Sequence, residues 1–266
     1  MAGLLKDKVA LITGAGAGIG RGVARKFIQE GAKVVVAEIN EENGRHVVKE
    51  LIDELGGEAC FIKTNVCIKE DVEAAVTHCI ETYGGIDILV NNAFALSPHV
   101  VLEKKTDEML ANTLNSGLWA SWWAMRAALP SMKKRGGGKI VNFYSIDADV
   151  AAWCHADYNM TKSAVLGLTR SAAAEWGRFN INVNAIAPAA RGTVFYQLAE
   201  QIPNFEEKAA ARKPLCRNGD PEDDIGPVVV FLCSAMSSYI TGEMINVDGG
   251  LHLPGYDSKP PELSVM

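Results

Sequence analysis

The sequence predicts an α/β fold of a single domain, a doubly wound parallel β-sheet with helices on both faces. Two observations carry this prediction. Short apolar runs alternate with segments of helical spacing through most of the chain, and the loops between them are short. The first apolar run passes through a glycine-rich turn into a helical segment, as the first βα unit of such a sheet does. Without a repeat or a linker, residues 1–266 are expected to form one domain.

Strands are predicted where short apolar runs are bounded by glycine or polar residues. These runs are 8–13, 33–37, 59–64, 86–90, 139–144, 181–186 and 244–247. Helical spacing with a glycine stop or a proline start predicts helices at 21–31, 41–55, 71–83, 106–134, 157–177 and 221–234. Residues 188–217 are irregular and then helical, and we expect them to form a lid over the substrate. The tail 251–266 holds three prolines and shows no periodicity, so it is expected to lie along a surface or a neighbouring subunit.

Charge and cysteine content narrow the function classes. The net charge of −6 argues against nucleic acid or an anionic membrane as the main partner. The N-terminal apolar run is too short for a signal peptide or a membrane span. The six cysteines are scattered without a C-x-x-C pair, which predicts reduced thiols, a cytoplasmic location and no zinc site.

The glycine-rich turn has the context of a phosphate-binding loop. It reads Thr13-Gly14-x-x-x-Gly18-x-Gly20 and lies between a strand and a helix, where backbone N–H groups and the helix dipole meet a pyrophosphate. The common G-x-G-x-x-G pattern does not fit in any frame. The alternative is a tight turn with spare glycines.

Glu38 ends the second strand, about 20 positions after the glycine turn. An acid at this place accepts hydrogen bonds from a ribose 2′-hydroxyl and repels a 2′-phosphate. Neither Ile39 nor Asn40 supplies a compensating positive charge, so the sequence favours NAD over NADP. The alternative is a solvated acid at a strand end.

Ser145, Tyr158 and Lys162 suggest acid–base chemistry. Tyr158 and Lys162 are four residues apart and share one face of a predicted helix. A phenol with its usual pKa of ~10 catalyses poorly at neutral pH unless a nearby positive charge favours its anion. Ser145 could then hold a carbonyl or carbinol oxygen against the Tyr158 hydroxyl. Alone the pattern is weak, because most Tyr–Lys helix pairs lie on the surface.

Together these motifs resemble those of the short-chain dehydrogenase/reductase family, over roughly residues 5–251. Each motif is loose, but their order and spacing are specific. The matching residues are the Thr13–Gly20 turn, Asn91-Asn92-Ala93, Ser145, Tyr158-x-x-x-Lys162, Pro188 with Thr193, Pro221-Glu-Asp223 ahead of Phe231-Leu232, and Asp248-Gly249-Gly250.

The resemblance implies a Rossmann fold and hydride transfer between NAD and a carbinol carbon. It makes Tyr158 the general acid/base, Lys162 the group that lowers its pKa and binds the nicotinamide ribose, and Ser145 the residue that positions the substrate oxygen. Thr193 would meet the carboxamide and Glu38 the adenosine ribose. The other implied cofactor contacts are Thr13, Gly14, Gly18, Ile19 and Gly20 at the pyrophosphate, Asn65 and Val66 at the adenine, and Asn91, Ala93 and Pro188 along the groove.

Several positions depart from the family pattern. Asn65 replaces an Asp, Phe94 and Ala189 each replace a Gly, and Tyr144 replaces a Ser. A ring at Phe94 would narrow the site above the nicotinamide or form a substrate wall. The fourth catalytic position of the family, normally an Asn that binds a water for proton relay, falls on Gly117. Asn115 or Ser116 could take its place only if the helix is locally distorted.

The substrate pocket is expected after Asn92, Ser145 and Pro188, with aromatic walls and a few polar groups that suit a medium-sized secondary alcohol or ketone. The acids around Tyr158 favour a neutral substrate, although Arg191 could offset them. His155 is expected at the rim of the pocket, with a proton relay as the alternative. The candidate residues are Phe94, Leu96, Ile146, Asp147, Trp153, His155, Arg191, Phe195 and Tyr196.

The sequence thus predicts an NAD-dependent secondary-alcohol dehydrogenase. The alternatives are a 3-oxoacyl-thioester reductase, or a nucleotide-binding family member whose catalysis is impaired by Gly117. The resemblance also implies a homotetramer that pairs the helices 106–134 and 157–177. Three tryptophans, Trp119, Trp122 and Trp123, exceed what one sheet-facing stripe needs and would lie at that interface or form extra core.

Overall fold

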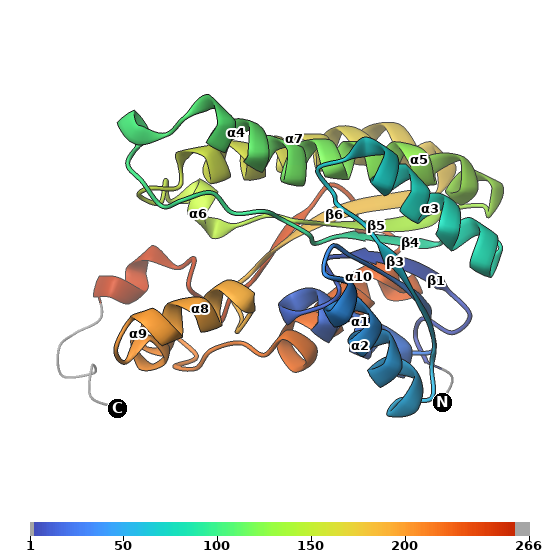
Figure 1. Cartoon of the computed structure of the whole chain (residues 1–266), viewed down its shortest axis with the longest axis horizontal. Helices are drawn as coiled ribbons and strands as arrows, with labels where there is room; N and C mark the ends of the chain where they lie inside the picture. The colour runs from blue at the N-terminus through green and yellow to red at the C-terminus, as the bar shows by residue number, and fades with distance from the viewer. Residues whose placement is uncertain (1–2, 259–266) are drawn as a thin grey trace.

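A computed structural model describes residues 3–258 of the chain (Figure 1). A seven-stranded parallel sheet in the order β3-β2-β1-β4-β5-β6-β7 forms its centre. The predicted doubly wound Rossmann fold is confirmed. The strands are β1 Val9–Thr13, β2 Lys33–Glu38, β3 Glu58–Lys63, β4 Ile88–Asn91, β5 Gly138–Phe143, β6 Ile181–Pro188 and β7 Met244–Val247.

Helices cover both faces of the sheet (Figure 1). On one face lie α1 Gly18–Gln29, α2 Glu41–Asp53 and α10 Gly226–Cys233; on the other lie α3 Lys69–Tyr83, α5 Ala120–Lys134 and α7 Ala156–Trp176. Successive strand residues point to opposite faces, so Leu11 and Ile12 of β1 enter different cores. Ile12 joins the core that holds Phe27 of α1, and Leu11 joins the core that holds Met125 of α5. Each such side chain stabilises the fold by roughly 1.5–3 kcal/mol.

The order of the strands places a binding site at one edge. The chain runs outward from β1 to β3, returns to set β4 beside β1, and then runs outward to β7. Ligands of open α/β sheets bind at such a reversal, beyond the carboxyl ends of the strands. The residues that follow the strand ends therefore gather where the neighbouring strands β1 and β4 end.

An ion-pair network fixes α1, whose first turn carries the glycine loop. Arg21 and Arg25 of α1 both pair with Glu50 of α2, and Arg25 also pairs with Glu222 at 2.6 Å. Burial alone would raise the pKa of Glu50, but the two guanidinium groups lower it instead. The carboxylate therefore stays charged and holds α1 against α2.

The predicted helix 106–134 is continuous but distorted in its middle. It consists of α4 Asp107–Leu114, a five-residue π-helical segment Asn115–Trp119, and α5. The distortion is centred on Gly117, and π segments of this kind are frequent at functional sites. The predicted helix 221–234 is likewise divided, into a π segment Pro221–Ile225 and α10.

Two other segments differ in detail from the prediction. Residues after Ser145 form a short helix, α6 Ile146–Asp149, that is not among the predicted helices. The expected lid contains α8 Thr193–Gln201 and α9 Phe205–Ala211, which lie on the opposite side of the strand ends from α4 and α6 (Figure 1). Its movement as a lid stays a prediction. The tail contains a 3-10 helix, Pro254–Ser258, and its residues 259–266 lie outside the described part of the chain.

No helix within residues 3–258 is both long enough and apolar enough to cross a membrane.

Candidate active site

A groove of about 630 Å³ lies at the carboxyl ends of the strands, on both sides of the reversal between β1 and β4. Its volume lies in the range of small-molecule and cofactor sites. Residues that end or follow β1, β2, β3, β4, β5 and β6 line it, together with two side chains of α7. Its lining includes Gly14, Ile19, Glu38, Asn65, Val66, Asn92, Ala93, Phe94, Leu96, Tyr158, Lys162, Pro188, Thr193 and Phe195.

The glycine turn has the shape of an anion cradle. Gly14 and Gly18 adopt left-handed φ angles of 65° and 52°, which favour glycine. A Cβ on Gly20 would lie 2.2 Å from the carbonyl oxygen of Gly14, so only glycine allows the helix to approach the turn so closely. No side chain caps the N-terminus of α1. Its backbone and dipole therefore fit a pyrophosphate, as predicted for a dinucleotide.

Glu38 is fixed against this turn rather than simply solvated. One carboxylate oxygen accepts a hydrogen bond from the N–H of Gly16 at 3.1 Å. The other accepts from the N–H groups of Ile39 at 2.9 Å and Asn40 at 3.0 Å. The negative charge therefore has a defined position in the groove, next to the loop that would hold the phosphates.

Thr13 and Asn92 tie β1 to the chain that follows β4. The Thr13 hydroxyl oxygen accepts hydrogen bonds from the N–H groups of Asn92 and Ala93, both at 3.1 Å. In return, the Asn92 amide donates to the carbonyl oxygens of Thr13 at 2.9 Å and Gly14 at 3.0 Å. These hydrogen bonds fix the start of the glycine turn against the segment that follows β4.

The groove is lined by Asn92 and not by Asn91, which corrects the prediction for the Asn91 side chain. Asn91 is the last residue of β4. Its side-chain amide is buried and donates to the side-chain oxygen of Asn142 on β5 at 2.8 Å. Asn142 in turn donates to the Thr169 hydroxyl at 2.9 Å. Asn91 therefore connects β4 to β5 and α7, while its neighbour faces the groove.

The two ends of the groove hold the remaining predicted contacts. Asn65 and Val66 line the end beyond Glu38, and the Asn65 side-chain oxygen accepts from the N–H of Cys67 at 3.0 Å. Thr193 begins α8 at the other end, beside Pro188. A Cβ on Gly18 would lie 3.0 Å from the Thr193 hydroxyl oxygen, so α8 starts directly against the glycine turn.

Tyr158 and Lys162 both reach the groove from α7. Burial raises the pKa of Tyr158 to about 12, more than its hydrogen bond with Ser145 lowers it, and the negative charge of Asp147 raises it further. Ser145 caps α6 and accepts from the N–H of Asp147 at 3.3 Å. Ser145 therefore lies close enough to Tyr158 to influence the pKa of its hydroxyl.

Lys162 is 5% exposed and donates to the carbonyl oxygen of Phe143 at 2.8 Å. Burial lowers its pKa to about 7, so near neutral pH the amine is divided between its charged and neutral forms. Burial favours the neutral form of both groups. The role of Lys162 in lowering the pKa of Tyr158 stays a prediction.

A carboxylate–histidine–histidine chain borders the site next to Tyr158. The Nδ1 of His155 lies 2.9 Å from a carboxylate oxygen of Asp147, and its Nε2 lies 3.0 Å from the Nε2 of His99. The ring of His155 packs against that of Tyr158, with centroids 5.6 Å apart. His155 thus contacts Tyr158 but is not part of the groove lining, and its place at the rim stays a prediction. His99 was missed, because nothing in the sequence relates positions so far apart.

The other predicted substrate residues divide into two groups. Phe94, Leu96 and Phe195 line the groove. Its lining does not include Ile146, Trp153, Arg191 or Tyr196, which corrects their assignment. Trp153 is 87% exposed, and Arg191 pairs with Asp220 at 2.9 Å.

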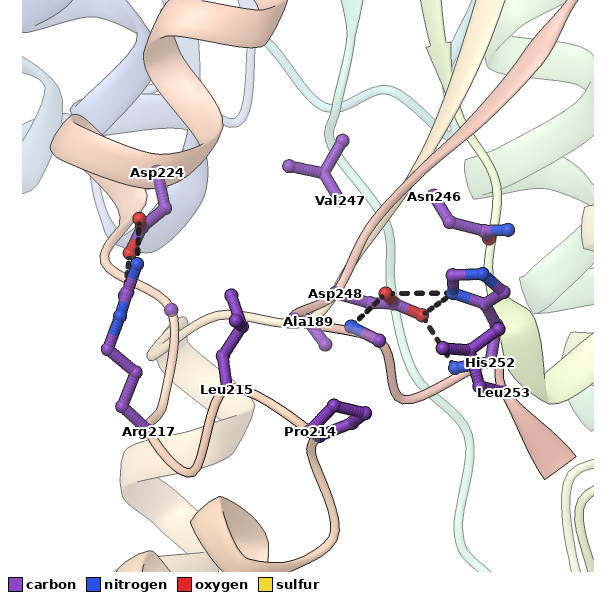
Figure 2. A pocket seen from close by; sticks show the side chains of 13 residues that line it. Ala189, Pro214, Leu215, Arg217, Asp224, Asn246, Val247, Asp248, His252 and Leu253 are labelled. Atoms are coloured by element: carbon purple, nitrogen blue, oxygen red, sulfur yellow. Dashed lines mark hydrogen bonds and ion pairs between the residues drawn. The ribbon is translucent and has the colours of Figure 1, made fainter. Parts of the chain in front are cut away.

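A second cavity, of about 440 Å³, lies between β7 and the segment 214–224 (Figure 2). Asp248 at its wall accepts from the N–H groups of Gly250 and His252, both at 2.9 Å, and pairs with the His252 ring at 2.9 Å. These bonds close the Asp248-Gly249-Gly250 turn, where both glycines have positive φ. The lining of this cavity does not include Ser145, Tyr158 or Lys162.

Comparisons with known proteins identify relatives of this chain. Residues 14–252 match the family model described as "Enoyl-(Acyl carrier protein) reductase". The human "Dehydrogenase/reductase SDR family member 4" is 38% identical over 250 residues, which are 92% of this chain and 88% of that protein. The chain belongs to the short-chain dehydrogenase/reductase family. It is thus a member of a family of oxidoreductases that use a nicotinamide cofactor.

Other family members show how widely substrates vary. A "3-oxoacyl-[acyl-carrier-protein] reductase" of Thermotoga maritima is 36% identical over 248 residues, covering 93% of this chain and 98% of that protein. The L-sorbose reductase of Gluconobacter frateurii, solved with NADPH and L-sorbose, superposes with a TM-score of 0.88 at 30% identity, covering 94% of this chain and 98% of that one. Family membership alone therefore does not identify the substrate of this protein.

The burial of Lys162 predicts a pH dependence of stability. Between pH 7 and the usual lysine pKa of about 10.4, the unfolded chain holds a proton that the folded chain has lost, so stability rises with pH in this window. The contribution is on the order of 1 kcal/mol per pH unit. We expect urea unfolding of wild type to show this rise between pH 7 and 9, Lys162→Met to lack it, and the exposed-site control Lys134→Met to keep it. Parallel profiles for wild type and Lys162→Met would contradict the assignment.

Proposed function

We propose that this protein is an NAD-dependent dehydrogenase that interconverts a secondary alcohol and a ketone, with Tyr158 as the general acid/base. One observation carries the proposal: Tyr158 and Lys162 line the same groove as the glycine turn and Glu38. Hydride chemistry and proton chemistry need adjacent sites, and this groove offers a place for both.

The nicotinamide cofactor, when bound, accepts or supplies the hydride. Ser145 holds the substrate oxygen, and Tyr158 donates to that oxygen or takes its proton. With a pKa of about 12, Tyr158 is protonated at neutral pH and is ready to protonate the oxygen of a ketone. For alcohol oxidation it must first lose that proton, which the charged form of Lys162 favours. Aromatic and apolar walls from Phe94, Leu96 and Phe195 favour a neutral substrate of medium size.

The catalytic role of Tyr158 can be tested by removing one oxygen atom. Tyr158→Phe is expected to lower kcat between a hundredfold and ten-thousandfold on any active member of a panel of secondary alcohols, the range for loss of a general acid/base. NAD binding, followed by tryptophan fluorescence, should change much less. The matched control is Tyr239→Phe, whose side chain is fully exposed at 103% and should leave kcat unchanged. Equal turnover by wild type and Tyr158→Phe would refute the assignment.

We also propose NAD rather than NADP as the preferred cofactor, because the Glu38 carboxylate is fixed beside the glycine turn and would repel a 2′-phosphate. Glu38→Ser removes this charge. We expect the preference for NAD, measured as the ratio of the two Kd values, to fall at least about tenfold, whereas the exposed α2 control Glu42→Ser keeps it. Wild type that binds NADP as tightly as NAD would overturn this proposal.

The 3-oxoacyl-thioester reductase is the second candidate, favoured by the Thermotoga maritima relative with that activity in its name. Such an enzyme would reduce 3-oxoacyl thioesters with NADPH. Neither Glu38 nor the acids next to Tyr158 favour this, because the cofactor phosphate and the acyl carrier phosphopantetheine are anionic. The third candidate is a family member with impaired catalysis. The comparison of wild type with Tyr158→Phe distinguishes it from an active enzyme, because only an active enzyme would lose turnover.

A homotetramer remains our proposal for the assembly, formed by α4, α5 and α7. In the single chain, Trp122 of α5 is 39% exposed and Met160 of α7 is 49% exposed. Trp119, in the π segment between α4 and α5, is 45% exposed. Large apolar side chains gather at subunit interfaces. Light scattering at micromolar concentration should give four times the mass of the chain, and a monodisperse monomer would contradict the proposal. The cytoplasmic location stays a prediction from the sequence.

A further inference from the structure

Phe94 covers the ammonium group of Lys162. The Lys162 Nζ lies 4.6 Å from the centroid of the Phe94 ring, and that ring meets the ring of Tyr158 edge to face at 5.1 Å. Phe94 follows β4, whereas Tyr158 and Lys162 belong to α7, so one side chain bridges two elements that form the site. Its position explains why an amine at the edge of an open groove is almost completely shielded from water.

Gly117 lies directly behind this ring. A Cβ at position 117 would be 2.9 Å from Cε2 of Phe94 and 2.5 Å from Cγ2 of Thr161. Thr161 is completely buried and β-branched, so it cannot move aside cheaply. The space that a side chain at position 117 would need is therefore partly filled by Phe94.

Ser116 does not replace the missing side chain at position 117. The Ser116 hydroxyl donates to the carbonyl oxygen of Asn112 at 2.9 Å, within its own helix. The carbonyl oxygen of Gly117 accepts from the Ser121 hydroxyl at 2.8 Å. On the side toward Lys162, the space beside Gly117 is closed by the Phe94 ring.

We propose that Phe94 is a positioning residue for Lys162 and that Phe94 and Gly117 form one matched unit, in which the ring covers the ammonium group and needs the absence of a side chain at position 117. The effect on catalysis rests on the proposed function, whereas the effects on stability and on the titration of Lys162 do not.

The surroundings of Lys162 show what the ring controls. The amine faces the carbonyl oxygen of Phe143 and the rings of Phe94 and Tyr158, and within residues 3–258 no carboxylate forms an ion pair with it. Tyr158 is the one titratable group among these contacts. The face of the Phe94 ring attracts the cation, but the ring also excludes water, and water stabilises the charged form more strongly. Opening this cover should therefore raise the pKa of Lys162 from about 7.

A double-mutant cycle tests the matched unit by urea unfolding, without reference to activity. Gly117→Ala in wild type should raise the unfolding equilibrium constant at least about tenfold through overpacking. In a Phe94→Gly background the same change should raise it by a smaller factor, because the contact with Phe94 is gone and only the contact with Thr161 remains. Gly167→Ala on α7 is the control, since its Cβ would enter open space and should not destabilise either background. Folding of the double variant where Gly117→Ala alone fails to fold would also support the unit.

The positioning role is tested by the pH at which stability begins to rise, which reports the titration of Lys162 in the folded state. Phe94→Gly should move this onset upward by about one pH unit or more. Phe94→Leu keeps an apolar cover and should not raise it. If Phe94→Gly lowers stability equally at all pH values with no shift in onset, or if the cycle gives the same factor for Gly117→Ala in both backgrounds, the proposal is overturned.

Discussion

The burial of one lysine amine at the carboxyl end of the sheet is the constraint around which this site is built. Lys162 has a single carbonyl acceptor, at the end of β5, and aromatic rings over the rest of its head group. Because water is excluded, the amine and the neighbouring phenol both favour their neutral forms. The site therefore holds two proton carriers whose charge depends on what else enters the groove.

The strands, the glycine turn and the acid at the end of β2 could be predicted, because each depends on local sequence pattern. Apolar runs and glycine spacing define β1 and the start of α1, and the acid must lie beside the turn because parallel strands end at one edge. The sequence could not show that Asn92 rather than Asn91 lines the groove. Neighbouring side chains in a strand point to opposite faces, so the assignment depends on the exact register of β4. Contacts between distant segments, such as His99 with His155, leave no local signal.

Two positions that differ from the family pattern become related once the structure is known. In the sequence, Phe94 and Gly117 are separate departures in different segments. In the fold, the ring at position 94 and a side chain at position 117 compete for one space. The sequence analysis named a helix distortion near Gly117 only as a requirement for Asn115 or Ser116 to act. The π segment itself could not be predicted, because the spacing of apolar residues does not show where a helix turn holds one extra residue. Restoring an Asn at position 117 alone would therefore meet steric resistance before it could affect a proton relay.

The central claim is that hydride passes between a carbinol carbon and NAD in the groove beside Tyr158. It is tested most directly by incubating the protein with NAD and a panel of secondary alcohols that carry deuterium on the carbinol carbon, and by analysing the reduced cofactor by mass spectrometry. We predict that NADH from each active alcohol carries one deuterium. NADH without deuterium, or no reduced cofactor from any member of the panel, would contradict the account.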